Sequence, residues 1–177
     1  MIMLDRVVSL FLQRQRDDAM AFTRESDLVT ISPISPQHFA VRLRCKGLVQ
    51  VRPGEIVTAE HFEFGVYMPS DYLRQANPFE VVTWFGPGNI WHPNISNKAP
   101  FICIGHLIPG TPLVDIIHRV FQIVAYQKVT MREDDDLNRE ACAWARQNQQ
   151  RFPIDGRPLK RRLISLEIED PGKGQEK

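Results

Sequence analysis

The sequence predicts an α+β fold in which helices are segregated from an antiparallel sheet, and three observations support this prediction. Apolar residues recur at helical spacing near the N-terminus and again after residue 111, whereas the region between them alternates with a period of two. Short connections such as Pro53-Gly54 join the alternating segments, which favours hairpins over crossovers. The expected order is a helix, a four-stranded antiparallel meander, a long irregular loop and two or more C-terminal helices.

The first helix is expected over residues 3–24. Leu4, Val7, Val8 and Phe11 recur at helical spacing, and charged residues occupy most of the remaining positions around the helix. This pattern is typical of an amphipathic helix that packs one apolar stripe on a core.

Strands are expected at 27–31, 38–45, 61–68 and 79–85. In the second of these, HFAVRLRC, Phe39, Val41, Leu43 and Cys45 share one face and charged residues share much of the other. Clean alternation of this kind indicates a sheet with one buried and one exposed face.

The region 86–110 is rich in proline, glycine and asparagine and has little periodicity. Long irregular segments in compact domains are usually functional. A buried helix follows, with Thr111 as the expected N-cap and Pro112 in the first turn. A further helix follows the acidic run at 133–136, whose charges suit a helix N-terminus. We expect a single domain over 1–160 and a polar, partly disordered tail over 161–177.

The composition excludes several classes of function. The formal net charge is +1, so no overall field attracts nucleic acid or an anionic membrane. The three cysteines are odd in number and widely spaced, which favours a reducing compartment over a disulfide framework. No signal peptide and no membrane-spanning run are recognised, and a cytoplasmic location is expected.

The segment WHPNISNKAPFICIGHL, residues 91–107, raises the functional question. A cysteine stands between two isoleucines, nine residues after a His-Pro-Asn triplet. It is either a buried, inert residue or a nucleophile with polar support.

Four segments in order answer that question through a resemblance: IWHPNI (90–95), FICIGHL (101–107), PLVDIIHRVFQIVA (112–125) and DDDLNREACAWA (134–145). Together they resemble the ubiquitin-conjugating enzymes. The chain departs from the usual pattern at several places, among them Gly105 in place of an acidic residue, Thr111 in place of tryptophan and Asp136 in place of proline. It is similar to divergent members found in bacterial ubiquitin-like operons, which implies a place in antiviral defence.

The resemblance implies a role for each motif residue. Cys103 would carry a ubiquitin-like protein as a thioester, and Asn94 would support the oxyanion or hold the active-site loop. His92 and Pro93 would be structural. Asp135, or a neighbour among 134–136, would orient the incoming lysine.

The remaining implications concern partners. Arg6 and Arg14 on the first helix would meet the activating enzyme, and a ligase is a further expected partner. No metal or cofactor is expected on this chain, since ATP and Mg²⁺ are used by the activating enzyme. In this hypothesis His106, three residues after Cys103, is a nearby proton acceptor. Cys103 and His106 alone do not make a zinc site, which needs about four ligands.

Two alternatives stay open. In the first, the chain is a catalytically inactive binding module for ubiquitin-like proteins. In the second, it is a thiol hydrolase that pairs Cys103 with His92 or His106.

Overall fold

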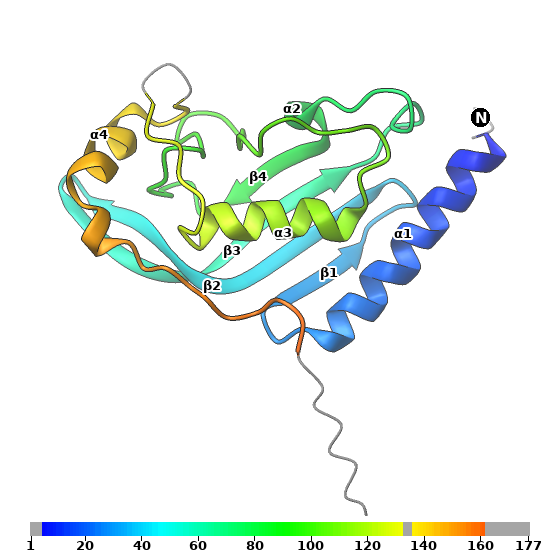
Figure 1. The fold of residues 1–177 in the computed structure, drawn as a ribbon, viewed down its shortest axis with the longest axis horizontal. Coiled ribbons are helices and arrows are strands. Elements are labelled where there is room, and N and C mark those ends of the chain that lie inside the picture. Colours follow the sequence, from blue (N-terminus) through cyan, green and yellow to red (C-terminus); the bar gives the residue numbers. More distant parts are fainter. Residues whose placement is uncertain (1–4, 133–135, 162–177) are drawn as a thin grey trace, which may run out of the picture.

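The computed structural model describes residues 5–132 and 136–161, and Figure 1 shows the order of its elements. The elements are α1 (Arg6–Glu25), β1 (Val29–Pro33), β2 (His38–Arg52), β3 (Glu55–Tyr67), α2 (Pro78–Val81), β4 (Val82–Gly86), α3 (Leu113–Val124), α4 (Arg139–Gln147) and the 3-10 turn η1 (Gln149–Arg151). No helix within the described ranges has the length and apolar character needed to cross a membrane.

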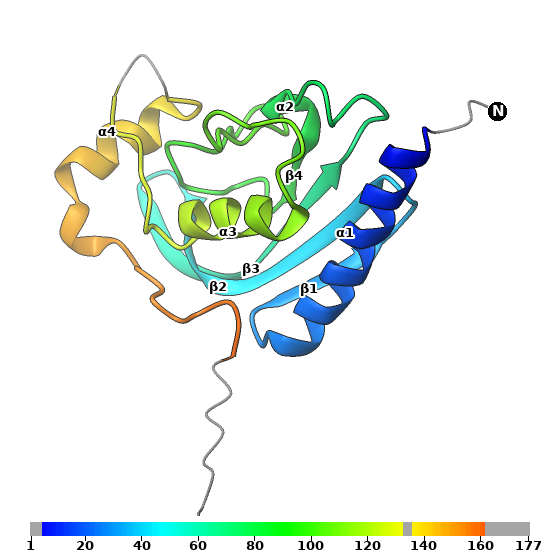
Figure 2. The same ribbon diagram turned by 45° about the vertical axis from the view of Figure 1, so that its right-hand side comes forward.

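The sheet is the antiparallel meander that the sequence predicts, with strand order β1-β2-β3-β4. Cross-strand partners such as Val41 with Phe64 and Leu43 with Phe62 all point into the core. The α+β class, with its N-terminal helix, four-stranded sheet and C-terminal helices, is confirmed. Figures 1 and 2 show α3 lying across one face of this sheet, with α1 along the β1 side and α4 at the opposite end.

The first helix begins at Arg6, three residues later than expected, because Asp5 is its N-cap. The Asp5 carboxylate accepts a hydrogen bond from Val7 N at 3.0 Å. The buried stripe is formed by Val8, Leu12, Gln15, Ala19 and Phe22. Placing Val7 on this stripe was wrong: its side chain is 63% exposed, since it lies about 100° around the helix from Val8. The expected part before residue 5 lies outside the described residues.

The run 79–85 is not a strand throughout. The Asn77 side chain accepts a hydrogen bond from Phe79 N at 3.1 Å, and Pro78 supplies a preset helical φ. Together they start the short helix α2, and β4 begins only at Val82.

The N-cap of α3 is Pro112, one residue later than the Thr111 cap expected from the sequence. Thr111 instead donates its hydroxyl to the Ile108 carbonyl at 2.6 Å. Proline has no side-chain acceptor, and the Leu113 amide is capped from another helix: buried Gln15 of α1 accepts it at 2.8 Å. This bond ties α1 to the helix that follows the cysteine loop.

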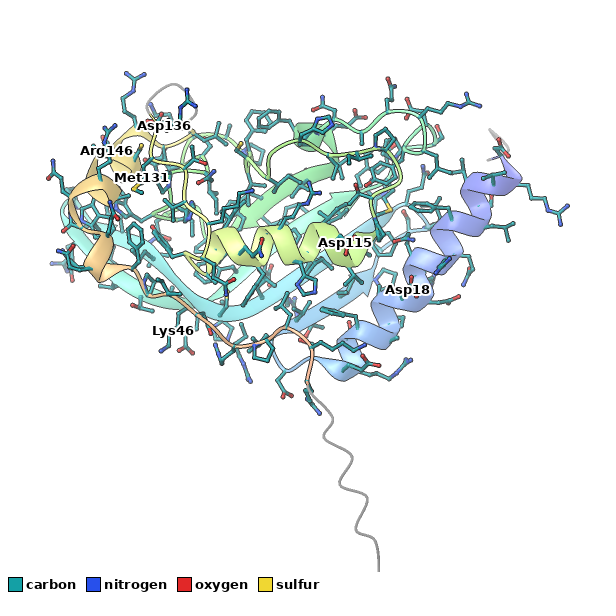
Figure 3. The ribbon with its side chains drawn as sticks, in the orientation of Figure 1. Asp18, Lys46, Asp115, Met131, Asp136 and Arg146 are labelled. Carbon is teal, nitrogen blue, oxygen red and sulfur yellow. The ribbon has the colours of Figure 1, made fainter. Side chains whose placement is uncertain are left out.

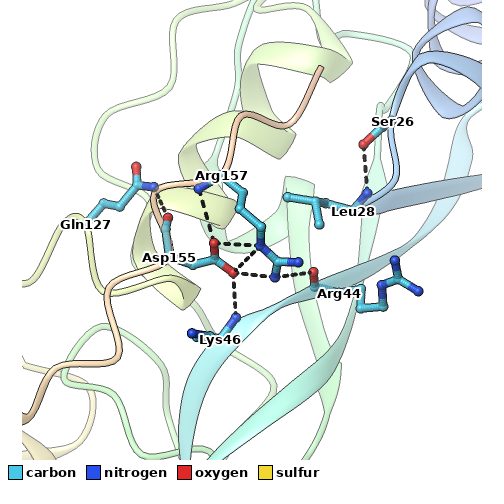
Figure 4. Close-up of polar contacts among 7 residues, drawn as sticks. All are labelled: Ser26, Leu28, Arg44, Lys46, Gln127, Asp155 and Arg157. Carbon is cyan, nitrogen blue, oxygen red and sulfur yellow. Dashed lines mark hydrogen bonds and ion pairs between the residues drawn. The ribbon is translucent and has the colours of Figure 1, made fainter. Parts of the chain in front are cut away.

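The C-terminal segment after η1 crosses the end of the sheet and returns towards α1 (Figure 1). Its anchor is Asp155, whose carboxylate accepts the Lys46 amide at 3.0 Å and pairs with Arg157 at 2.6 Å (Figure 4). Farther along, the Arg161 amide donates to the Glu25 carbonyl and its guanidinium pairs with Asp27. Arg161, placed in the tail by the sequence, is therefore held on the end of α1.

The Asp155 clamp predicts a pH-dependent loss of stability. Hydrogen bonds from Arg157 lower the pKa of Asp155 from 3.8 to about 2. The stabilisation is complete above the ordinary pKa and disappears as pH falls towards 2. At about 1.4 kcal/mol for each pKa unit, it amounts to about 2 kcal/mol. Asp155→Asn should lower the free energy of unfolding in urea by that amount at pH 7, and the gap to wild type should narrow below pH 4.

The control for this prediction is Glu55→Gln, which breaks the exposed pair with Arg52 at 4.0 Å. Exposed pairs contribute little, so the change should be below about 0.5 kcal/mol. Equal losses in the two variants, or a gap that does not depend on pH, would contradict the assignment of the clamp.

Candidate active site

The His92-Pro93-Asn94 triplet forms a buried turn at the end of a segment attached to β2. The segment is attached by an antiparallel bridge between Ile90 and Val49 and by a hydrogen bond from Trp91 N to the Leu48 carbonyl. The turn is closed by Ile95 N donating to the His92 carbonyl at 3.2 Å. Within the described residues, the strand-like pairing of this segment is thus the single bridge between Ile90 and Val49.

A small hairpin connects this turn to the cysteine. Ile95 and Ile102 form an antiparallel bridge, Ser96 N donates to the Phe101 carbonyl, and Cys103 N donates to the Asn94 carbonyl at 2.8 Å. This register sets Cys103 directly across the hairpin from Asn94. The sequence motif brings the two residues together although nine positions separate them.

Alternation explains why the cysteine stands between isoleucines. In an extended segment, neighbouring side chains point to opposite sides. Ile102 and Ile104 are fully buried, whereas Cys103 is partly exposed. Gly105 follows with φ of +79°, a conformation that disfavours any side chain, so this backbone accounts for the missing acidic residue.

Cys103 differs from the two other cysteines of the chain. Cys45 and Cys142 are both buried. Burial raises the pKa of the Cys45 thiol to about 12, which keeps it protonated and unreactive. Of the three, Cys103 alone is partly exposed.

The Asn94 side chain makes two hydrogen bonds with Thr130, a residue that the sequence did not single out. Asn94 Oδ1 accepts the Thr130 amide at 2.9 Å, and Asn94 Nδ2 donates to the Thr130 hydroxyl at 2.9 Å. The Asn94 side chain therefore holds the segment after α3 in place, and one of its two Nδ2 hydrogens is used to do so. A single threonine in an irregular segment carries no sequence signal that could have revealed this.

His92 is a neutral structural residue in this geometry. Its Nδ1 accepts the Asn94 amide at 3.0 Å, which places the remaining ring proton on Nε2. Complete burial lowers the pKa of His92 to about 3. The ring therefore stays neutral near pH 7 and is not suited to act as a general base.

Tyr126 packs against the His-Pro-Asn turn and is a second residue that the sequence did not single out. Its φ of 56° is unusual for a residue with a side chain and costs on the order of 1 kcal/mol. The ring packs edge-on against His92 at 4.5 Å between centroids, and the hydroxyl donates to the Trp91 carbonyl. The strained residue at the end of α3 thereby fixes the turn.

The other expected site residues are placed as follows. His106 is exposed, its carbonyl accepts Arg119, and no hydrogen bond joins its ring to Cys103 in the described part of the chain. Asp135 and Asp134 lie outside the described residues. Asp136 lies beside the start of α4 (Figure 3). Within residues 5–132 and 136–161, no group of three His, Cys, Asp or Glu side chains is arranged so that it could hold a metal ion.

The proposed partner face of α1 is exposed. Arg6 is exposed, and the Arg14 side chain is 81% exposed and lies 3.8 Å from Asp18. Val7 and Leu10 on the same outer side are each 63% exposed. Two apolar side chains between two arginines make a surface suited to a protein partner.

Comparison with known proteins gives a likeness in fold. No family model matches the sequence, and no curated protein matches it. Among solved structures, a Toxoplasma gondii ubiquitin-conjugating enzyme domain matches with a TM-score of 0.55 and 17% identity over 80% of this chain and 90% of that one. A candidate ubiquitin-conjugating enzyme from Plasmodium yoelii gives the same score and identity over 80% and 87%.

A third structure, described as a novel ubiquitin-conjugating enzyme, matches with a TM-score of 0.52 and 17% identity over 81% of this chain and 88% of that one. These matches span most of each protein, and their low identity limits the likeness to architecture. The chain has the ubiquitin-conjugating fold in a divergent form.

Proposed function

We propose that this chain is a ubiquitin-conjugating-like transferase that carries a ubiquitin-like protein as a thioester on Cys103. The observation that carries the proposal is the partly exposed Cys103 on a small hairpin, paired through its backbone with Asn94 of the buried turn. A fold shared with ubiquitin-conjugating enzymes supports the same reaction class.

The proposed reaction has two acyl transfers. In loading, the Cys103 thiolate attacks the thioester that joins the modifier to its activating enzyme, and the enzyme's thiolate leaves. In discharge, a neutral lysine amine of the target attacks the Cys103 thioester, a C–N bond forms, and the C–S bond breaks. The amine proton passes to solvent or, as the resemblance implies, to a carboxylate among residues 134–136, and Cys103 is left as a thiolate.

Asn94 contributes to these steps by holding the loop and by keeping one Nδ2 hydrogen uncommitted to Thr130. A pre-aimed amide donor at a developing oxyanion can contribute about 3 kcal/mol. His92 contributes shape alone, because its Nδ1 is occupied and its pKa is far below neutrality. The thiol hydrolase that would use His92 as base is disfavoured for the same reason.

The surroundings of the reaction follow from the resemblance. The activating enzyme, which uses ATP and Mg²⁺, would dock on the α1 face around Arg6 and Arg14. A ligase would bring the target lysine, and the cytoplasm would keep the thiol reduced. A bacterial antiviral operon is the proposed genetic setting, and the absence of a ubiquitin-like gene and an activating-enzyme gene beside this one would contradict it.

The first test is thioester formation. The chain is mixed with ATP, with the ubiquitin-like protein encoded by the neighbouring gene and with the enzyme that activates that protein. The mixture is run on a non-reducing gel. We expect an adduct that a reducing agent removes and that Cys103→Ala does not form. If the activating enzyme carries the modifier as a thioester but no adduct forms on this chain, the result would favour the binding module and overturn the transferase.

A second test needs no partner protein. Iodoacetamide at pH 8 should alkylate the folded chain once, at Cys103, because the buried Cys45 thiol has a pKa of about 12 and Cys142 is inaccessible. Intact-mass measurement counts the labels. Labelling of folded Cys103→Ala at a comparable rate would show that Cys103 is not the accessible nucleophile.

The third test concerns Thr130. Thr130→Val removes the acceptor of Asn94 Nδ2, and single-turnover discharge should slow about tenfold or more, whereas Thr130→Ser should stay within about threefold. Because the two residues act as a unit, Asn94→Ala with Thr130→Val should be no slower than Asn94→Ala alone. Additive losses, or equal losses for valine and serine, would show that Thr130 does not act through Asn94.

A further inference from the structure

The face of the sheet turned away from α3 carries an apolar groove. Figures 1 and 2 show α3 across one face of the sheet and, among the described helices, none across the other. A hollow of about 190 Å³ lies on this outer face, and its lining includes Ile34, Ala40, Gly65, Tyr67, Thr83 and Phe85. We call it the outer groove.

Small residues create the outer groove. The sheet register sets four of them side by side across the strands: Ser32, Ala40, Gly65 and Thr83. The ring of Phe85 lies against Gly65, where an added Cβ would be 2.4 Å from the ring. Ile34 is 70% exposed and Phe85 is 58% exposed. Large apolar side chains left this exposed beside a hollow indicate a binding surface.

The sequence that follows Arg161 has the pattern of an extended segment with one apolar face. Residues 162–177 lie outside the described part of the chain, and 162–170 read RLISLEIED. Ile164, Leu166 and Ile168 take alternate positions, with Ser165 and Glu167 between them. Alternation with a period of two favours extended chain whose apolar side is covered. Pro171-Gly172 marks the end of the pattern.

This segment starts within reach of the outer groove. Arg161 is held beside the start of β1, since its amide donates to the Glu25 carbonyl at 2.9 Å and its guanidinium pairs with Asp27. The path from Asp27 along β1 to the level of Ser32, and two strands across to Gly65, is roughly 19 Å. An extended chain from Arg161 to residue 168 spans roughly 23 Å.

The free edge of β1 is closed to the same segment. Its outward amides are occupied by α1: Val29 N donates to Ser26 Oγ at 3.1 Å, and Ile31 N donates to Thr23 Oγ1 at 3.0 Å. A further strand cannot pair with amides that already have acceptors. The outer face of the sheet is therefore the apolar surface left for this segment near Arg161.

The charges along the path suit the segment as well. Arg42 and Arg44 are exposed on the outer face of β2, between the start of β1 and the outer groove. Arg42 pairs with Glu63, and the Arg44 side chain has no ion pair within residues 5–132 and 136–161. The segment carries acidic residues at 167, 169 and 170. Opposite charges at the rim of an apolar contact favour one orientation.

We propose that residues 163–169 of this chain lie as an extended segment across the outer face of the sheet. Leu166 and Ile168 fill the outer groove between Ile34 and Phe85, and the acidic residues lie towards the arginines of β2. The face is then covered from within the chain, so a partner protein can use it only by displacing this segment. The proposal does not depend on the chemistry of Cys103.

The test measures proximity with a nitroxide label on Ser165→Cys in full-length Cys103→Ser chain. The label attaches at residue 165, because Cys45 and Cys142 are buried. In the ¹⁵N-labelled protein, the amide signals of Ala40, Gly65 and Thr83 should lose intensity, and reduction of the nitroxide should restore it. Gly54, in the turn at the other end of the β2–β3 hairpin, should keep its signal.

Matched variants test the contact itself. Leu166→Ser combined with Ile168→Ser should abolish the loss of intensity, whereas Leu163→Ser, on the other side of an extended segment, should leave it unchanged. On the sheet, Phe85→Ser should abolish the loss. Phe79→Ser is the control, since Phe79 is also exposed, at 46%, but belongs to α2 and lies outside the outer groove.

A mixed sample identifies the occupant. Nitroxide-labelled chain without ¹⁵N is added to ¹⁵N-labelled chain without nitroxide, and no loss of intensity is expected. Loss at Ala40 and Gly65 in this mixture would assign the outer groove to a second copy and overturn the proposal. Full intensity at these amides in the singly labelled chain would overturn it too, as would a loss that survives the Leu166 and Ile168 changes.

Discussion

The hydrogen bond from Cys103 N to the Asn94 carbonyl is the constraint around which the site is organised. It fixes the partly exposed Cys103 opposite a turn whose polar groups hold the neighbouring segments. His92 Nδ1 holds the Asn94 amide, the Asn94 side chain holds Thr130, and the Pro93 carbonyl holds the start of α4. These bonds start from three consecutive residues, so the cysteine hairpin, the segment after α3 and the start of α4 are all attached to one short piece of backbone.

The surroundings of Cys103 and the cavity beside α4 differ in polarity. Cys103 itself has buried isoleucines on either side and is partly exposed, so the core fixes the direction of its side chain. The cavity of about 620 Å³ between residues 97–98 and the start of α4 is lined by charged and amide groups together with Leu137 and Ala143.

Much of this arrangement could be predicted from local patterns, and the rest depends on contacts between distant segments. Alternation predicted the core faces of β2 and β3, and the sequence motif predicted that Asn94 and Cys103 belong together. Local signals misplaced the cap of α3, because Gln15 supplies the acceptor from α1, ninety-eight residues away. Thr130 and Tyr126 carry no local signature at all, and only the path of the chain after α3 brings them to the turn. Asp135 is a prediction that lies outside the described residues.

The contacts of the C-terminal segment can form only late in the synthesis of the chain. Asp155 bonds the Lys46 amide across 109 residues of sequence, and Arg161 bonds Asp27 across 134. A chain emerging from the ribosome can complete its sheet and α3 well before these residues are made. The clamp on β2 and the end of α1 can close only when almost the whole described chain has been translated, so a nascent chain stalled after α4 would expose the apolar surface that Leu159 covers in the finished protein.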